Sequence, residues 1–296
     1  NGRGMKVLPL VLAGFILGGC AAEGGVLSEV QEAAADLFLP PEQAAQLGAR
    51  MAQEIEAKQP LHPSAELQAR VARLGERVLA QAGEVPQAYD FSFKAIQDPD
   101  TVNAFALPGG HIYLTRGLVE RTRTGEEFAG VLAHEIGHVA ARHGVQKLQR
   151  HLRTGSLVNV LYNTILGGEP SLLRENSLQI ANVVWSAGHS RRDEREADRL
   201  AVEYMLRSGV DPDGIVSLLS TLLTEERQQQ VDEVGMMEMW LSTHPLTAER
   251  IEAAERDIRR LRSRTEATAD LEMDAFPAFR KVVLRQAPPP IEMIEP

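Results

Sequence analysis

The sequence predicts an α+β fold, a mostly helical domain with a small β-sheet or hairpin beside a central helix. Apolar residues recur at helical spacing over most of the chain, whereas strand-like alternation is confined to residues 89–115. No repeat appears at a period typical of helical arrays. With 296 residues, 44% of them hydrophobic, the chain can bury the core of one large domain or two modest ones.

The charge of the chain narrows the classes of partner. Its formal net charge is -10, with acidic and basic residues spread throughout. Such a chain offers no basic surface for a phosphate backbone, so nucleic-acid binding is not expected. Proteins, peptides or small molecules are the expected partners.

The first residues resemble a bacterial lipoprotein leader. Lys6 precedes an apolar run, Val7 to Leu17, that is too short to span a bilayer. The run ends in "LGGC", which is similar to a lipobox, and Cys20 is the only cysteine. We therefore expect a signal peptide at residues 1–19, lipidation of Cys20 and a lipidated linker at residues 20–27.

Such a lipid anchor would hold the protein on a membrane without a spanning helix, since each buried CH₂ contributes about 0.8 kcal/mol. Ala21, rather than an aspartate, follows the cysteine. By resemblance to bacterial sorting rules, this alanine implies the outer membrane. The expected location is the periplasmic face of a bacterial cell envelope.

Three helices are expected ahead of the strands. Ser28 to Gln59 is rich in Ala, Glu and Gln and is broken by the turn "PPE", which predicts two helices. Ser64 to about Ala82 predicts the third, because its apolar residues form one stripe at positions 67, 71, 74 and 78.

The predicted strands follow. Tyr89 to Gln97 alternates apolar and polar residues, as a half-buried strand would. Thr101 to Thr115 predicts two further strands joined at Pro108, Gly109 and Gly110.

The rest of the chain is expected to be helical, up to a flexible proline-rich tail at residues 286–296. The predicted helices are Thr124–His143, Gly155–Leu166, Ser171–Trp185, Arg191–Ser208, Pro212–Gln230 and Leu246–Arg262. Gly155 to Gly168 is apolar with glycines at both ends, which suits a mobile lid, a membrane contact or a plain core helix.

The segment "LAHEIGH" carries two histidines four residues apart. Thr124 and Glu127 have capping-box spacing, so the segment lies within a predicted helix. At about 100° per residue, His134 and His138 are only about 40° apart around the axis, so both imidazoles can reach one ion. Glu135 lies at the edge of the helix face that the two histidines share. In catalytic sites zinc takes three protein ligands and a water, whose proton such a glutamate can accept and pass to a leaving amine.

The motif alone does not exclude an accidental match in an ordinary amphipathic helix, because only three of its five positions are fixed. Ala133 and Gly137 are small and leave room for a second element. A third ligand is therefore needed to decide between a metal site and an accidental match. Metzincins would have a histidine at position 144, but this residue is a glycine.

The other common third ligand is a glutamate from a later helix, and "SRRDEREADRLA" supplies the candidates. Glu194 and Asp198 lie four residues apart on one face, whereas Glu196 points elsewhere. We expect Glu194 to bind the metal and Asp198 to accept the outer ring N–H of a ligating histidine. Ala197 and Ala201 share that face and would let the two helices close on each other. A solvated face of ion pairs is the alternative.

Four segments together resemble a gluzincin metallopeptidase family that includes CAAX prenyl endopeptidases, heat-shock membrane proteases of the HtpX type and periplasmic lipoprotein metalloproteases. They are, in the order of that family, "NAFALPGGHIYLTRGL", "VLAHEIGHVAARH", "SRRDEREAD" and "STHPLTAERI". The match spans residues 65–262 and is more specific than any one motif. The lipobox makes the chain most similar to the lipoprotein branch.

The resemblance implies a zincin-type metalloprotease domain, expected at residues 28–285. It implies one Zn²⁺ per chain, bound by His134, His138 and Glu194. It also implies that Glu135 is the general base and acid.

The resemblance further implies that the segment "HPLTAER" lies near the metal. His244 would be a fourth ligand that keeps the enzyme latent, or a donor to the oxyanion once displaced. Arg250 would help to stabilise that charge or would pair with an acid. A helix-capping His-Pro is the alternative interpretation of this segment.

The hairpin suggests how a substrate would bind, because an edge strand beside the metal can pair with an extended peptide. Such pairing selects unfolded chains with little sequence specificity. A structural edge without a substrate is the alternative. The expected edge residues are Asn103, Ala104, Phe105, Ala106 and Leu107.

The sequence thus predicts a zinc metalloendopeptidase that hydrolyses peptide bonds in misfolded or misassembled cell-envelope proteins. One alternative is a non-proteolytic envelope assembly factor or holdase with the same fold, although a pure binder does not need an intact set of ligands and base. Another is a zinc-stabilised scaffold, although structural zinc sites usually close with four Cys or His ligands.

Overall fold

The computed structural model describes residues 39–154, 188–229 and 242–262. The predicted signal peptide, Cys20 and the linker, the first predicted helix, the predicted helices at 155–166 and 171–185, and the tail lie outside the described residues. The described part is mostly helical around one small sheet, which confirms the predicted α+β class. Within it, no helix is both long enough and apolar enough to cross a bilayer.

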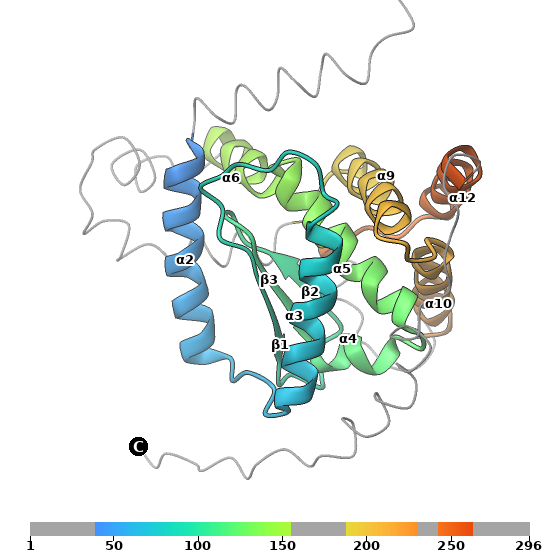
Figure 1. The fold of residues 1–296 in the computed structure, drawn as a ribbon, viewed down its shortest axis with the longest axis horizontal. Helices are drawn as coiled ribbons and strands as arrows, with labels where there is room; N and C mark the ends of the chain where they lie inside the picture. Colours follow the sequence, from blue (N-terminus) through green and yellow to red (C-terminus); the bar gives the residue numbers. More distant parts are fainter. Residues whose placement is uncertain (1–38, 155–187, 230–241, 263–296) are drawn as a thin grey trace, which may run out of the picture.

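Helices surround the sheet in the described part of the chain (Figure 1). In chain order they are α2 (Pro41–Lys58), α3 (Ala65–Leu79), α4 (Arg116–Arg121), α5 (Gly125–Ala140), α6 (His143–Thr154), α9 (Arg191–Arg207), α10 (Asp213–Gln229) and α12 (Ala248–Arg262). Most of these helices lie in segments predicted to be helical. The short helix α4 was not predicted, α5 ends at Ala140 rather than at His143 as expected, and α6, which begins at His143, was not predicted.

The sheet has three strands in the order β1-β3-β2. β2 (Ala104–Ala106) and β3 (His111–Thr115) pair antiparallel and form the predicted hairpin. Gly109 and Gly110 in its turn have positive φ angles of 86° and 106°, which glycine adopts without steric cost. β1 (Ser92–Ile96) pairs parallel with β3, and β2 therefore lies at an edge of the sheet.

The two faces of the sheet enter different cores. Ile112 and Leu114 of β3 pack in the cluster that includes α3, α5 and α9, whereas Tyr113 packs in the cluster that includes α2. This alternation is the two-residue period of a strand that is buried on both faces. Figure 1 shows the sheet between α2, in blue, and α3, in teal. The free edge of β2 remains on the side of α5.

The helix that carries "HEIGH" begins as the sequence indicates. The hydroxyl oxygen of Thr124 accepts a hydrogen bond from the backbone N–H of Glu127 at 3.2 Å. The Glu127 carboxylate accepts from the backbone N–H of Arg123 at 2.6 Å, one residue before the position of a capping box. The cap therefore fixes the start of α5 and the direction in which its histidines point.

The prediction of one helix through His143 is wrong at its end. Arg142 has a left-handed φ of 55° between α5 and α6, which a non-glycine residue adopts at a steric cost. Its guanidinium donates hydrogen bonds to the carbonyl oxygen of Leu39 at 2.5 Å and the hydroxyl of Tyr89 at 3.1 Å. These contacts from distant parts of the chain hold the break.

Helices α5 and α9 approach each other closely, as their small residues predicted. A Cβ atom added at Gly137 would lie 3.1 Å from the carbonyl oxygen of Ala197. Ala197 and Ala201 are completely buried at this contact. The two backbones can therefore bring side chains from both helices to one point.

Candidate active site

Three side chains from α5 and α9 meet in the core between these helices. His134 and His138 turn their Nε2 atoms toward each other, 3.0 Å apart. The Oε2 atom of Glu194 lies 3.6 Å from His134 Nε2, and its Oε1 atom lies 3.3 Å from His138 Nε2. All three side chains are buried. The structure thus brings the three predicted ligands together.

His244 joins this group from the segment before α12. Its Nδ1 atom lies 3.4 Å from His134 Nε2 and 3.2 Å from Glu194 Oε1. Its Nε2 atom lies 3.4 Å from the carbonyl oxygen of Ala104. A proton on Nε2 would be donated to that carbonyl, which leaves the Nδ1 lone pair directed at the other three groups.

The spacing of these four groups suits a metal ion. Two ligand atoms about 2.0–2.1 Å from a tetrahedral zinc ion are separated by about 3.4 Å. The separations given above, from 3.0 to 3.6 Å, lie around that value. Each residue can place one ligand atom within 4.8 Å of the others. Imidazole nitrogen and carboxylate oxygen are also donors that zinc accepts.

The carboxylates of α9 are held in their charged form. Arg250 of α12 lies 2.5 Å from Glu194 Oε2 and forms a bidentate pair with Asp198 at 2.7 and 2.8 Å. Burial alone would raise the pKa of both acids, but the Arg250 guanidinium lowers the pKa of Asp198 and holds that of Glu194 well below its ordinary value. Of the two roles considered for Arg250, the structure shows pairing with acids.

Asp198 also orients the first histidine. Its Oδ1 atom lies 3.0 Å from His134 Nδ1, so a carboxylate stands at the outer ring nitrogen while Nε2 is left for the cluster. Burial opposes a charge on His134, but Asp198 and Glu194 raise its pKa to about 10. The surrounding carboxylates therefore favour positive charge at the centre of this group.

Glu135 lies beside the cluster, and its Oε1 atom is 3.7 Å from His244 Nε2. The side chain is buried, and burial raises its pKa above the ordinary value. A carboxylate in such an environment accepts a proton more readily than one in water.

Two further histidines border the site, and neither was predicted to be a site residue. The Nδ1 atom of His143 lies 2.9 Å from the Nδ1 atom of His138, and its Nε2 atom lies 3.6 Å from a Glu196 carboxylate oxygen. Glu196 does point away from the ligand group, as predicted, but it faces this second histidine. His143 thus stands behind His138 as Asp198 stands behind His134. His143 reaches His138 only because the chain breaks between α5 and α6, and the sequence pattern does not indicate this break.

His189 is the second of these histidines. Its ring stacks on His138 with centroids 3.9 Å apart, and its backbone N–H donates to the carbonyl oxygen of Thr243 at 3.0 Å. A Cβ atom at Gly188 would lie 2.4 Å from the carbonyl oxygen of Ser242. The residues before α9 therefore hold the segment that carries His244.

The predicted edge strand lies next to the cluster. The backbone groups of Asn103 and Leu107 bond to β3, through Thr115 N–H to the Asn103 carbonyl and through Leu107 N–H to the His111 carbonyl. Phe105 stacks on Tyr113 in the core. By alternation, Ala104 and Ala106 direct their backbone N–H and C=O groups to the free edge, where the Ala104 carbonyl faces His244.

Comparison with known proteins agrees with this geometry. The model of Peptidase family M48 matches residues 65–258, a range that contains every site residue described above. The beta-barrel assembly-enhancing protease of Yersinia pestis is 29% identical over 262 residues, which cover 83% of this chain and 51% of that protein. The protein of the same name from Escherichia coli K12 is 27% identical over 229 residues, which cover 73% of this chain and 44% of the relative.

A eukaryotic relative has a sequence identity to this chain similar to that of the bacterial relatives. The mitochondrial metalloendopeptidase OMA1 of Saccharomyces cerevisiae is 31% identical over 160 residues, which cover 53% of this chain and 44% of that protein. The chain spans about half the length of the curated relatives it matches. The family model, in contrast, covers most of the described chain and both helices of the site, so the chain belongs to peptidase family M48.

Proposed function

We propose that this protein is a zinc metalloendopeptidase that hydrolyses peptide bonds in misfolded or misassembled cell-envelope proteins. The observation that supports it most directly is the convergence of His134, His138 and Glu194 at metal-ligand spacing, with Glu135 beside them. A bound Zn²⁺ would polarise a peptide carbonyl and make water acidic enough to lose a proton near neutral pH.

The protein's own residues would carry the remaining steps. Glu135 accepts the proton of the attacking water and passes it to the leaving amine, which its raised pKa favours. Asp198 keeps His134 in the tautomer that exposes Nε2, and Arg250 keeps Asp198 ionised and in place. The donor set stays in place during the reaction because α5 and α9 are packed backbone to backbone.

The free edge of β2 would hold the substrate. An extended peptide can pair with the outward N–H and C=O groups of Ala104 and Ala106 without reading much sequence. A folded protein offers few extended segments, so this mode of binding selects unfolded or misassembled chains. Pairing at Ala104 also requires His244 to leave the Ala104 carbonyl, which it faces at 3.4 Å.

We further propose that the enzyme works at the periplasmic face of a bacterial envelope, anchored to the outer membrane through lipid on Cys20. The bacterial relatives are named beta-barrel assembly-enhancing proteases, and bacterial β-barrels of this kind span the outer membrane. The lipobox-like "LGGC" at the end of an apolar run supports the same location.

Incubation with a permanently unfolded protein tests the peptidase function. We expect the zinc-loaded protein to cut it, a chelator to stop cleavage, and added Zn²⁺ to restore it. Glu135→Gln should abolish cleavage while the zinc content, measured by atomic emission, stays near one per chain, because the amide removes the base but no ligand. A charge-matched control is Glu120→Gln on α4, which should cut at the wild-type rate.

Three outcomes would contradict the proposal or a part of it. Cleavage that survives complete metal removal would exclude the metal-dependent mechanism. A zinc-loaded protein that binds the unfolded chain but leaves it intact would favour the holdase alternative. Full activity in Glu135→Gln would exclude this glutamate as the base.

A further inference from the structure

We propose that His143 is a positioning residue for the metal site. It accepts a hydrogen bond from the outer ring nitrogen of His138 and so fixes the orientation and the tautomer in which His138 binds zinc. The other nitrogen of His143 faces Glu196, which ends the chain of side chains on α9. The proposal rests on the metal centre of the proposed function, and its test measures zinc binding rather than cleavage.

The two ring nitrogens of His138 face different groups. Its Nε2 atom lies 3.0 Å from His134 and 3.3 Å from Glu194, so the lone pair on Nε2 is the one directed at an ion. The proton of a neutral ring then lies on Nδ1, which is 2.9 Å from the Nδ1 atom of His143, an ordinary hydrogen-bond length. The Nδ1 atom of His143 must therefore be the acceptor.

The second nitrogen of His143 has a suitable neighbour for this arrangement. A lone pair on Nδ1 requires the proton of that ring to lie on Nε2. Glu196 Oε2 lies 3.6 Å from this atom, which is too long for a direct hydrogen bond but close enough for its charge to favour a proton there. His143 is 1% exposed, so water screens this attraction only in part. The tautomers of both rings thus agree along the chain His138–His143–Glu196.

A second metal ion is the competing explanation for these imidazoles, because His138, His143 and His189 could each offer one nitrogen to an ion. The ring of His189, however, stacks on His138 with planes only 28° apart and centroids 3.9 Å apart. The lone pair of an imidazole nitrogen lies in the plane of its ring, so two stacked rings converge poorly on one ion. His138 would also have to bind two ions at once. The geometry therefore favours a hydrogen bond between His138 and His143.

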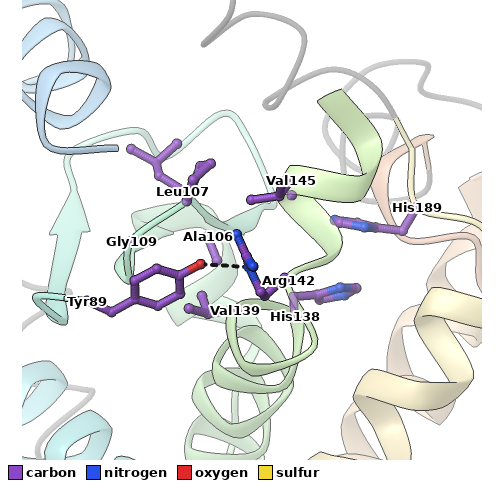
Figure 2. Close-up of a pocket in the computed structure, with 11 residues that line it drawn as sticks. Tyr89, Ala106, Leu107, Gly109, His138, Val139, Arg142, Val145 and His189 are labelled. Carbon is purple, nitrogen blue, oxygen red and sulfur yellow. Dashed lines mark hydrogen bonds between the residues drawn. The ribbon is translucent and has the colours of Figure 1, made fainter. Parts of the chain in front are cut away.

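The contact with His138 exists because the chain breaks between α5 and α6. On one continuous helix, residue 143 would lie about 140° around the axis from His138 and would face away from the metal ligands. The left-handed φ of 55° at Arg142 redirects the chain. Arg142 donates to the Tyr89 hydroxyl at 3.1 Å, as Figure 2 shows, and to the Leu39 carbonyl at 2.5 Å. The strained turn thus brings an imidazole to the outer side of a metal ligand.

The two histidine ligands are oriented by different groups. Asp198 stands directly at the outer nitrogen of His134, whereas His138 reaches a carboxylate only through the ring of His143. Outer partners of this kind hold the ring and raise its basicity, and their loss lowers metal affinity about 10–100-fold. We expect the loss of His143 to fall in this range. Loss of Glu196, which acts through a second ring, should have a smaller effect.

Two variants at His143 separate a hydrogen-bond acceptor from mere packing. His143→Asn places its Oδ1 atom near the position of the imidazole Nδ1 and keeps an acceptor, whereas His143→Leu keeps more of the volume and removes the acceptor. Chelator competition measures the zinc affinity of the whole protein, and the visible absorption of the Co²⁺-loaded form reports the geometry of the ligands. Thermal unfolding of the metal-free forms shows whether each variant is folded.

We expect His143→Leu to lower the zinc affinity about 10–100-fold and to change the Co²⁺ spectrum, and His143→Asn to stay within about threefold of the wild type. A residue that only filled space would give the reverse order, because leucine fills a buried site better than asparagine. Glu196→Gln should lower the affinity a few-fold, since the hydrogen bond between the rings remains. The charge-matched control on α9 is Glu203→Gln, at a residue that pairs with Arg207, and it should bind zinc as the wild type does.

Several results would overturn the positioning role. They are a wild-type zinc affinity and Co²⁺ spectrum in His143→Leu, and an asparagine variant that binds zinc no better than the leucine variant. A wild type that binds two Zn²⁺ per chain, with one lost in His143→Leu, would assign the ring to a second metal site instead. A Glu196→Gln protein equal to its control would remove Glu196 from the chain. The expected affinities in a protein that leaves an unfolded chain uncut would support the positioning role and contradict only the peptidase function.

Discussion

At the scale of single residues, His244 makes two contacts at positions that an arriving substrate would have to occupy. Its Nδ1 atom faces the ligand group, and its Nε2 atom faces the Ala104 carbonyl on the free edge of β2. An imidazole at the fourth position of a zinc site excludes the water that a catalytic site keeps. With a zinc ion bound, His244 in this position would hold the site closed, which is the first of the two roles considered for it.

Replacement of this residue separates the two roles considered for it. We expect His244→Ala to keep its zinc, because three ligands remain, and to cut an unfolded protein several times faster than the wild type. Initial rates at equal zinc content measure the effect, with His62→Ala, at a histidine outside the ligand group, as the control. A rate that falls tenfold or more would instead identify His244 as a donor to the oxyanion.

Residue spacing alone predicted which side chains share a face of one helix, and this was enough for His134, His138, Glu194 and Asp198. It could not predict His143 behind His138. That contact depends on the left-handed turn at Arg142, which is held by Leu39, about 100 residues earlier in the chain. A periodic pattern contains no signal for a break that distant contacts impose.

At the scale of elements, the site is a contact between α5 and α9 stabilised by Arg250 of α12. The start of α5, its close contact with α9 and the hairpin could be predicted from a cap, small residues and turn glycines, whereas the end of α5 could not. The parallel pairing of β1 with β3 could not be predicted, because the apolar alternation of a strand does not indicate which strand pairs with it. The short helix α4 was missed because its six residues are too few for a clear period.

The close approach of the two site helices can be tested at Gly137. Alanine is favoured over glycine in a helix by about 1 kcal/mol, but its Cβ atom would lie 3.1 Å from the Ala197 carbonyl oxygen, and overpacking costs about 1–3 kcal/mol. We expect Gly137→Ala to lower the Tm by a few degrees and to weaken zinc binding. Thermal unfolding and chelator competition measure the two effects.

Gly144→Ala is the natural comparison for that variant, since the nearest atoms to its added Cβ lie at 3.7 Å or beyond. Its Tm should stay at or above the wild-type value. A Gly137→Ala protein with a raised Tm would show that the helices can separate at little cost.

At the scale of the whole molecule, one ion would join elements from three parts of the chain. His134 and His138 lie on α5, Glu194 lies on α9 and His244 precedes α12. A ligand that binds only the folded state stabilises it by about 2.7 kcal/mol at 100 times its Kd. The metal should therefore contribute to folding as well as to chemistry.

Thermal unfolding with and without zinc measures this contribution. For a domain of this size, 1 kcal/mol corresponds to about 2–4 °C, so saturating zinc should raise the Tm by about 5–10 °C. Glu194→Ala should bind zinc much more weakly and show a smaller rise, because it removes the only anionic ligand and leaves three imidazoles. A wild-type zinc content in this variant would reassign the third ligand.

The proposed lipid anchor also concerns the whole molecule. Cys20→Ala should move the protein from the membrane fraction to the soluble fraction of bacterial cells, because it removes the thiol that would carry the proposed lipid. The zinc content and peptidase activity of the released protein should be unchanged. A variant that stays with the membrane would show that something other than this lipid retains it.

The contact of Gly188 with the Ser242 carbonyl, and of His189 N–H with the Thr243 carbonyl, has one more consequence. Gly188 and His189 lead into α9, which carries Glu194, and Ser242 and Thr243 lie two residues and one residue before His244. A displacement of the start of α9 would therefore be passed through these backbone contacts to His244. The carboxylate and the imidazole are thus coupled twice, once by their own side chains and once by the main chain behind them.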